Sequence, residues 1–444
     1  MFKKVLIANR GEIALRVIDA CHQLGIQTVA VFSEADREAL HTRMADEAYC
    51  IGPPPANQSY LNIAQIMSVA EVTGADAVHP GYGFLAENSH FVEVCEESNL
   101  KFIGPSAAVM EATGDKLAAK RAAQAAQVPL IPGSDLITGE DMLEAVAQEI
   151  GFPLLLKASA GGGGRGMRVV HDHTALLGEF HAAQREAQAA FGRSDVYVEK
   201  LLQTPRHVEV QVLADEHGHV VHWGDRDCSV QRRYQKLIEE SPAPNLSQEL
   251  QTQLRKAAVR VAKRLNYTNA GTVEFLIEND AFYFIEMNAR IQVEHPVSEM
   301  LVGMDLVAEQ IRVAAGEALG YGQRQLHLEG HAIECRINAE DPNKDFMPSS
   351  GTLTVSSIPT GHGVRWDSAV FTGMAVSPFY DSLLGKLITW APTREQARRR
   401  MLTALRRLQL EGIATTRTLC QDIVNHQAFA EHTHTTDFIE NLLG

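Results

Sequence analysis

Hydrophobic residues follow two different spacings at the start of the chain. Short apolar runs, which are typical of buried strands, cover residues 5–8, 28–32, 75–78 and 101–103. Between the first two runs, apolar residues recur at helical spacing from Ile13 to Leu24. Strands and helices that alternate in this way form parallel sheets with helices on both faces. The predicted fold class is therefore α/β, with a doubly wound N-terminal domain.

A polar turn, Asn9-Arg10-Gly11, follows the first predicted strand, at the place where such sheets often bind ligands. The turn holds a single glycine, so the fingerprint of dinucleotide-binding domains is missing. We therefore expect no nicotinamide cofactor at this turn.

The pattern changes after Gly114. An alanine-rich helix is predicted over residues 116–127. Further along, two strands flank a turn at residues 278–280, and mixed strands with a basic helix follow Gly330. The chain is therefore predicted to have three regions, residues 1–113, 114–329 and 330–444.

Composition narrows the classes of function. The 444 residues carry 40 Lys and Arg against 55 Asp and Glu, for a formal net charge of -15, which argues against nucleic acid or an anionic membrane as the main partner. The 6 cysteines are far apart, so neither a disulfide framework nor a zinc site is expected. No apolar run reaches the ~18 residues of a membrane span, and the N-terminal run is too short for a signal peptide. We expect a cytoplasmic protein.

A glycine-rich segment, Gly161 to Gly164 followed by Arg165 and Gly166, is the strongest local signal. It contains GxGxxG, but a strand pattern at residues 167–170 follows it instead of the helix that a Rossmann site needs. No Lys-Ser or Lys-Thr pair follows it either, which excludes a Walker loop. A glycine turn between strands can direct its N–H groups at phosphates, with Lys157 supplying charge. A flexible surface hairpin is the alternative.

Acidic residues lie on the two strands around residues 278–280. If the turn centres near Asp280, Glu274 lies opposite Glu286, and Asn288 faces the same way. Directly opposed carboxylates repel each other, and a hard divalent cation such as Mg²⁺ removes the conflict. The alternative is a pair of glutamates that face solvent.

The segment after these strands places Arg290, Gln292 and Glu294 on one face if it stays extended. A guanidinium beside a carboxylate can hold a small anion while the carboxylate removes its proton.

Two further polar patterns can be explained without a binding or catalytic role. His207 begins a strand pattern in which polar residues alternate with valines, but a lone histidine is as consistent with a structural role. Residues 231–236 form a basic strip in an acidic protein, and a solvated face is the default interpretation of such a strip.

Five segments together resemble the biotin carboxylase component of biotin-dependent carboxylases, a member of the ATP-grasp family. Glycine loops alone are weak evidence, whereas long motifs in family order over nearly the whole chain are specific. The segments are HPGYGFL at 79–85, KASAGGGGRGM at 157–167, RDCSVQRR at 226–233, EMNARIQVEHPVSE at 286–299 and ECRINAEDP at 334–342.

The resemblance implies an N-terminal α/β domain, an ATP-grasp domain with a mobile glycine-loop lid at about residues 131–200, and a C-terminal mixed, β-rich domain. It implies ATP contacts at Lys116, Lys157, Glu199, Lys200, Leu201, Leu202, His207 and Gln231, with Gly163 and Gly164 over the phosphates. Glu274, Glu286 and Asn288 would hold Mg²⁺ or Mn²⁺. Bicarbonate would be bound by Lys236, Arg290, Gln292 and Val293, with Glu294 as general base. Arg336 would steady the biotin enolate, with Tyr82 and Asp381 nearby.

The implied reaction is ATP- and bicarbonate-dependent carboxylation of biotin through carboxyphosphate, as the first half-reaction of acetyl-CoA carboxylase in fatty acid synthesis. The alternatives are the same component of another carboxylase, another ATP-grasp ligase, or a nucleotide-binding regulator. The chain has no Met-Lys pair, the usual biotinylation motif, so a separate biotin carboxyl carrier protein and a carboxyltransferase are the expected partners.

Several positions depart from the family pattern. Tyr234 stands where a histidine is common beside the nucleotide, and Ala289 replaces a frequent threonine. A homodimer is expected, but Asp19, Gln23 and His362 differ at positions that the resemblance associates with the subunit contact.

Overall fold

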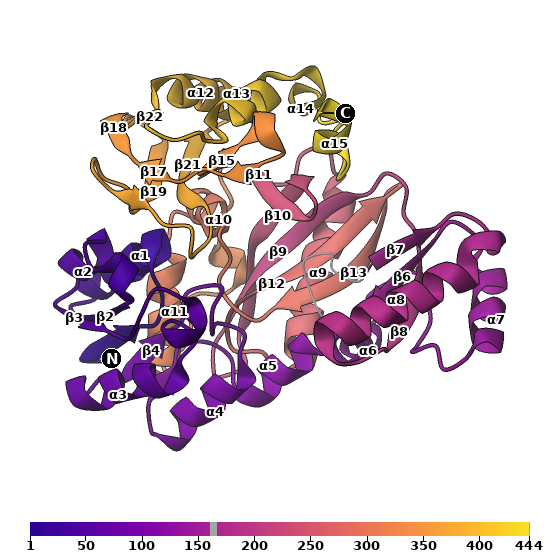
Figure 1. The fold of residues 1–444 in the computed structure, drawn as a ribbon, viewed down its shortest axis with the longest axis horizontal. Helices are drawn as coiled ribbons and strands as arrows, with labels where there is room; N and C mark the ends of the chain where they lie inside the picture. The colour runs from indigo at the N-terminus through magenta and orange to yellow at the C-terminus, as the bar shows by residue number, and fades with distance from the viewer. Residues whose placement is uncertain (160–166, 444) are drawn as a thin grey trace.

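The computed structural model describes residues 1–159 and 167–443. A parallel sheet of order β3-β2-β1-β4-β5 forms the N-terminal part, at the lower left of Figure 1. The four strands predicted there are confirmed, whereas β3 was missed because its residues alternate between half-buried and exposed at the sheet edge. The bounds are β1 Lys4–Ile7, β2 Gln27–Phe32, β3 Glu47–Cys50, β4 Ala77–His79 and β5 Lys101–Phe102.

The first helix begins at the last residue of the polar turn, Gly11, and buries the apolar stripe that predicted it, including Ile13, Val17 and Ile18. Gly11 opens the helix at a φ of +66°, a conformation in which glycine carries no steric penalty. The helices of this part are α1 Gly11–Gln23, α2 Leu40–Met44, α3 Ile63–Thr73, α4 Ser89–Glu97 and α5 Ala107–Gly114.

The region predicted as a lid is a small unit with its own core. Its sheet has the order β7-β6-β8, and Leu143, Leu156, Phe180 and Val198 pack together between this sheet and two helices. The glycines of residues 161–164 lie between β6 and β7, outside the described residues. The elements from residue 116 on are α6 Lys116–Ala125, α7 Glu140–Ile150, β6 Leu154–Ala158, β7 Met167–Val170, α8 Leu176–Phe191 and β8 Val196–Lys200.

A large sheet runs through the centre of the molecule in the order β13-β12-β9-β10-β11-β14-β21-β19. It continues across the boundary predicted near residue 330, because β11 pairs directly with β14. Cavity-facing residues of the middle and C-terminal regions therefore lie on one sheet. Its strands are β9 Arg206–Ala214, β10 Val220–Arg232, β11 Gln235–Ser241, β12 Asn269–Glu278, β13 Ala281–Asn288, β14 His331–Asn338, β19 Val364–Ser368 and β21 Leu383–Ala391.

Helices cover this sheet, and a separate apolar core lies beneath the C-terminal ones. No helix among residues 1–159 and 167–443 has the length and apolar character to cross a membrane. The helices are α9 Gln248–Arg264, α10 His295–Val302, α11 Leu306–Ala314, α12 Arg394–Arg407, α13 Arg417–Asn425, α14 Gln427–Ala430 and α15 Phe438–Leu443. The remaining short strands are β15 Glu340–Asp341, β16 Met347–Pro348, β17 Gly351–Thr352, β18 Thr354–Ser357, β20 Ala375–Val376 and β22 Gln409–Glu411.

Candidate active site

One cavity of about 1040 Å³ lies where the N-terminal part, the lid unit and the large sheet meet. Every site residue predicted from the sequence lines this cavity, except Gly163 and Gly164, which lie outside the described residues. The lining includes Tyr82, Lys116, Lys157, Glu199, Lys200, Leu201, Leu202, His207, Gln231, Lys236, Glu274, Glu286, Asn288, Arg290, Gln292, Val293, Glu294, Arg336 and Asp381.

The pairing of Glu274 with Glu286 is confirmed, but the turn alone does not produce it. Asn279 and Asp280 form a tight turn at positive φ, and this turn places Glu278 opposite Ala281. Continued without interruption, that register would bring Ile285 opposite Glu274. A shift of one residue next to Phe275 brings Glu286 there instead, as a β-bulge does.

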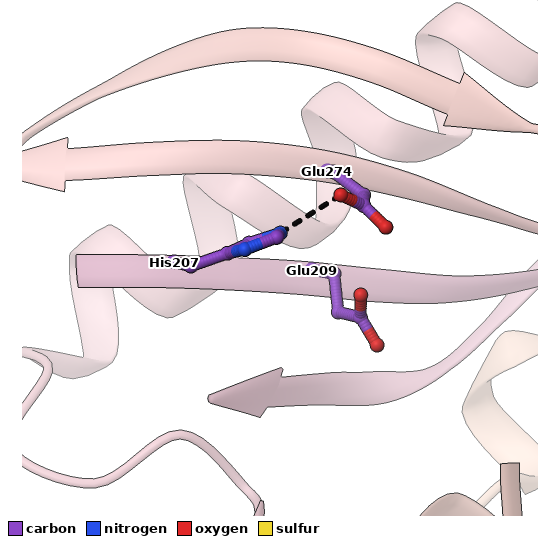
Figure 2. Close-up of side chains that lie close together, drawn as sticks. All are labelled: His207, Glu209 and Glu274. Atoms are coloured by element: carbon purple, nitrogen blue, oxygen red, sulfur yellow. Dashed lines mark hydrogen bonds and ion pairs between the residues drawn. The ribbon is translucent and has the colours of Figure 1, made fainter. Parts of the chain in front are cut away.

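The surroundings of the two carboxyl groups differ. Glu274 Oε1 accepts hydrogen bonds from Asn288 and Gln292, each at 2.7 Å. Its Oε2 lies 2.8 Å from His207 Nε2, the contact drawn in Figure 2 beside Glu209. Burial alone would raise the pKa of Glu274, but Lys236 and His207 hold it well below its ordinary value.

Glu286 lacks that compensation. Burial and the nearby charge of Glu274 raise its pKa, and Lys116 only partly opposes them. The two opposed carboxyl groups and Asn288 therefore form an oxygen-rich site with an unresolved charge conflict, and this donor set fits a hard divalent cation.

Glu294 lies between two cations. Its Oε1 is 2.7 Å from Lys236 Nζ, and its Oε2 is 2.8 Å from Arg336 Nη2. Burial would raise the pKa of Glu294, but Lys236 and Arg336 lower it well below its ordinary value. Glu294 is therefore an ionised carboxylate whose two oxygens are both engaged by cations.

The segment from Arg290 to Glu294 does not stay extended, so the condition for placing its side chains on one strand face is not met. The chain turns at residues 293–294 and enters α10. Arg290 pairs with Glu87 at 3.0 Å, and Gln292 accepts from the buried Arg226 at 2.7 Å. The three predicted side chains still reach one cavity, because the turn directs them there.

A second cationic group occupies the lid side of the cavity. Lys157 Nζ lies 2.6 Å from Glu199 Oε2, and Lys120 pairs with the other oxygen of Glu199. Burial lowers the pKa of Lys116, with Lys157 adding to that effect and Glu286 opposing it. Three lysines thus line one side of the cavity or pair with its lining, which suits a polyanion.

Family models match the chain in three consecutive parts. The model described as "Biotin carboxylase, N-terminal domain" matches residues 1–110, "Carbamoyl-phosphate synthase L chain, ATP binding domain" matches 115–321, and "Biotin carboxylase C-terminal domain" matches 334–441. "Biotin carboxylase 1" of Bacillus subtilis is 52% identical over 99% of this chain and 98% of its own. The chain belongs to the biotin carboxylase family. Members of this family are ATP-dependent ligases.

Relatives of different carboxylases are similarly close. A pyruvate carboxylase subunit of Methanothermobacter thermautotrophicus is 52% identical over 98% of this chain and 90% of its own. A solved biotin carboxylase complex with βγ-ATP from Campylobacter jejuni has a TM-score of 0.96 at 47% identity, covering 99% of both chains. The biotin carboxylase domain dimer of Hydrogenobacter thermophilus 2-oxoglutarate carboxylase, solved with MgADP, ADP and bicarbonate, has a TM-score of 0.95 at 49% identity, covering 99% of this chain and 98% of its own.

The positions that depart from the biotin carboxylase pattern lie in different surroundings. Tyr234 is 57% exposed at the turn between β10 and β11 and lines the cavity, whereas Ala289 is buried. Asp19 and Gln23 line a second cavity, of about 470 Å³. His362 packs edge-on against Trp390.

Sequence reasoning missed several charges that support the site. Arg226 is fully buried and donates to Gln211 at 2.8 Å as well as to Gln292. Glu239 accepts from Arg336 Nε at 2.6 Å. Arg226 stands in a recognised motif, but the burial of its charge depends on strands from distant segments, so no local signal reveals it.

Proposed function

We propose that this chain carboxylates biotin on a separate carrier protein, using ATP and bicarbonate, as the first half-reaction of acetyl-CoA carboxylase. The observation that carries the proposal is the position of Glu294 between Lys236 and Arg336, beside the paired carboxyl groups of Glu274 and Glu286. An ionised base among cations, next to a cation site, suits proton removal from a small anion during phosphoryl transfer.

ATP is proposed to lie along the lid side of the cavity. Its phosphates would face Lys116 and Lys157, with the adenine against the strand end at residues 199–202 and near His207 and Gln231. The βγ-ATP and MgADP complexes of the relatives support this assignment. Glu274, Glu286 and Asn288 would hold Mg²⁺ or Mn²⁺, which supplies charge neutralisation at the phosphates.

Bicarbonate is proposed to bind at Lys236, Arg290, Gln292 and Val293. An anion bound at Lys236 would pair with the ammonium group that otherwise pairs with Glu294. The Glu294 carboxylate would then be less stabilised by positive charge, and its pKa would rise. Glu294 is thereby able to accept the bicarbonate proton, and the resulting carbonate oxygen attacks the terminal phosphorus of ATP with release of ADP.

Biotin is proposed to enter beside Tyr82, Arg336 and Asp381. The carboxyphosphate formed from ATP and bicarbonate would break down to CO₂ and phosphate in the closed cavity. The phosphate would take the ureido N–H proton of biotin, and the deprotonated nitrogen would attack CO₂ to form the new N–C bond. Arg336 would stabilise negative charge on the ureido oxygen. Water would destroy carboxyphosphate, so a closing lid is part of the proposal.

The test is ATP hydrolysis by the purified chain with and without bicarbonate, free biotin and Mg²⁺. We expect hydrolysis to require Mg²⁺ and bicarbonate and to rise with biotin. Hydrolysis that is indifferent to bicarbonate and biotin would point to another ATP-grasp ligase.

A second candidate is the same component of a 2-oxo acid carboxylase. It is favoured by the 52% and 50% identities to subunits named for pyruvate and 2-oxoglutarate carboxylase. Co-purification would identify the biotin carboxyl carrier protein and the carboxyltransferase. Transfer of label from bicarbonate to acetyl-CoA, pyruvate or 2-oxoglutarate in that assembly decides between the two.

The proposal also covers the oligomeric state and the cellular location of the chain. The chain would work as a homodimer in the cytoplasm, and the solved dimer of a relative supports the dimer. Sedimentation of the purified chain measures the oligomeric state, and fractionation of the source cells measures the location.

A further inference from the structure

Lys386 is a buried charge just behind the cavity. Its side chain is fully buried on β21, and it is not among the residues that line the cavity. Its Nζ donates to the carbonyl oxygen of Val293 at 2.8 Å. The same nitrogen lies 3.1 Å from Glu12 Oε1 and 4.0 Å from Asp367 Oδ2. One ammonium therefore joins α1, the turn before α10 and two strands of the large sheet.

The contact with Val293 fixes one half of the turn that carries the base. Arg336 is the direct cross-strand neighbour of Lys386, and it holds the side chain of Glu294 at 2.8 Å. Neighbouring cations on the sheet thus hold consecutive residues of the turn, one by its carbonyl and the other by its carboxylate. A shift of the carbonyl would move the backbone that presents both Val293 and Glu294.

The contact with Glu12 extends to the other end of the cavity. Glu12 Oε1 accepts a hydrogen bond from the Tyr82 hydroxyl, and Tyr82 lines the cavity. The second oxygen, Oε2, is buried with no hydrogen-bond partner among the described residues. Glu12 therefore depends on Lys386 for cationic compensation while it orients Tyr82.

Burying an ammonium and its carboxylate partners is unfavourable unless geometry and hydrogen bonds compensate for it. Two other carboxyl groups face Lys386. Asp367, on the neighbouring strand β19, pairs more closely with Arg365, at 2.6 Å. Glu334 has two buried oxygens without a hydrogen-bond partner among the described residues. Burial lowers the pKa of His295, which follows the base, and the charge of Lys386 lowers it further. Lys386 is thus the cation of this cluster that contacts both the Val293 carbonyl and Glu12.

We propose that Lys386 is a positioning residue for the carboxylation reaction. It sets the Val293–Glu294 turn directly and the Tyr82 hydroxyl through Glu12, so that the bicarbonate and biotin sites form together. This inference rests on the proposed function, because it uses the assignments of Val293 to bicarbonate and Tyr82 to biotin.

The test is steady-state kinetics of Lys386→Met, which keeps the length of the side chain and removes the charge. We expect the KM values for bicarbonate and biotin to rise at least tenfold, while the KM for ATP stays within twofold of wild type. The matched control is Arg394→Met, which removes a half-buried cation that pairs with the buried Glu240 outside the cavity. We expect Arg394→Met to lower thermal stability. Its KM values for bicarbonate and biotin, each divided by its KM for ATP, should stay at the wild-type ratios.

Glu12→Gln tests separately the contact of Lys386 with Tyr82 through Glu12. It also tests the inference if Lys386→Met does not fold. It should raise the KM for biotin and leave that for bicarbonate near the wild-type value. Equal KM values in Lys386→Met and wild type, or a Glu12→Gln enzyme with unchanged KM for biotin, would overturn the inference alone. A wild-type enzyme without bicarbonate- and biotin-dependent hydrolysis would instead overturn the proposed function, and this inference with it.

Discussion

Glu274 and Glu286 face each other across neighbouring strands because β13 carries one extra residue at a bulge. The turn at Asn279 and Asp280 would otherwise have placed Ile285 in that position. Bulges re-aim side chains next to active sites, and here the bulge brings a second carboxyl group to a buried first one.

Glu286→Gln tests the role of this pair. The substitution removes one of two opposed charges, so the metal-free protein should unfold about 2 °C higher in EDTA, the shift expected for ~1 kcal/mol in a large domain. The Mg²⁺ concentration for half-maximal ATP hydrolysis should rise at least tenfold. Thermal unfolding and Mg²⁺ titration measure the two effects. Asp280→Asn, at the tip of the same hairpin, should change neither, and a normal Mg²⁺ requirement in Glu286→Gln would exclude Glu286 as a ligand.

Glu294→Gln should remove the proposed base and little else. Carboxylation of biotin should fall at least 100-fold, within the usual contribution of a general base. Binding of an ATP analogue should stay within about threefold of wild type, because Lys236 keeps Glu209 at 2.6 Å and Arg336 keeps Glu239. Calorimetric titration with the ATP analogue measures the affinity of wild type and Glu294→Gln, and turnover assays of the same two proteins measure carboxylation. If nucleotide affinity fell as steeply as turnover, Glu294 would have a structural role instead.

Tyr234→Phe asks whether the tyrosine replaces a nucleotide contact. The side chain is 57% exposed, which leaves little room for a packing role. Loss of one hydrogen bond should raise the KM for ATP by roughly 2–10-fold, equivalent to 0.5–1.5 kcal/mol. Turnover at saturating ATP should change little, because the bond would serve ground and transition states alike. Tyr234→His, measured at pH 7 and 8, is the companion variant, and an unchanged KM in Tyr234→Phe would show that the hydroxyl does not bind ATP.

The buried Glu240 predicts acid-sensitive stability in the C-terminal part. Burial would raise its pKa, but hydrogen bonds from His331 and Arg394 lower it to about 2. A lowered carboxyl pKa stabilises the fold above the unfolded value of 4.5, and this contribution disappears as the pH falls toward the folded value.

Glu240→Gln should therefore be less stable than wild type at pH 7, with a pH-dependent contribution of about 3 kcal/mol. The difference should shrink steadily below pH 4.5. Urea unfolding of both proteins between pH 7 and 3.5 measures it. A difference that stays constant over this range would mean that the carboxylate charge contributes nothing.

Much of the fold is readable from local sequence patterns. Apolar runs and helical spacing predict four strands of the N-terminal sheet, its first helix and the β12–β13 hairpin, because burial of a strand or a helix face is recorded in consecutive residues. Edge strand β3 carries no such pattern, since an edge needs no apolar run. The long family motifs predict, in addition, which residues line the cavity.

Relationships between distant segments are decided only by the tertiary structure. The sequence by itself determined which residues carry charge near the cavity, such as Glu274, Glu294 and Arg336. The tertiary structure decided the bulge that selects Glu286, the turn that aims Glu294, and the burial of Lys386 against Glu12, which is far away in the chain. The physical reason is that a charge is buried or compensated by whatever packs against it, and strands far apart in sequence supply those neighbours.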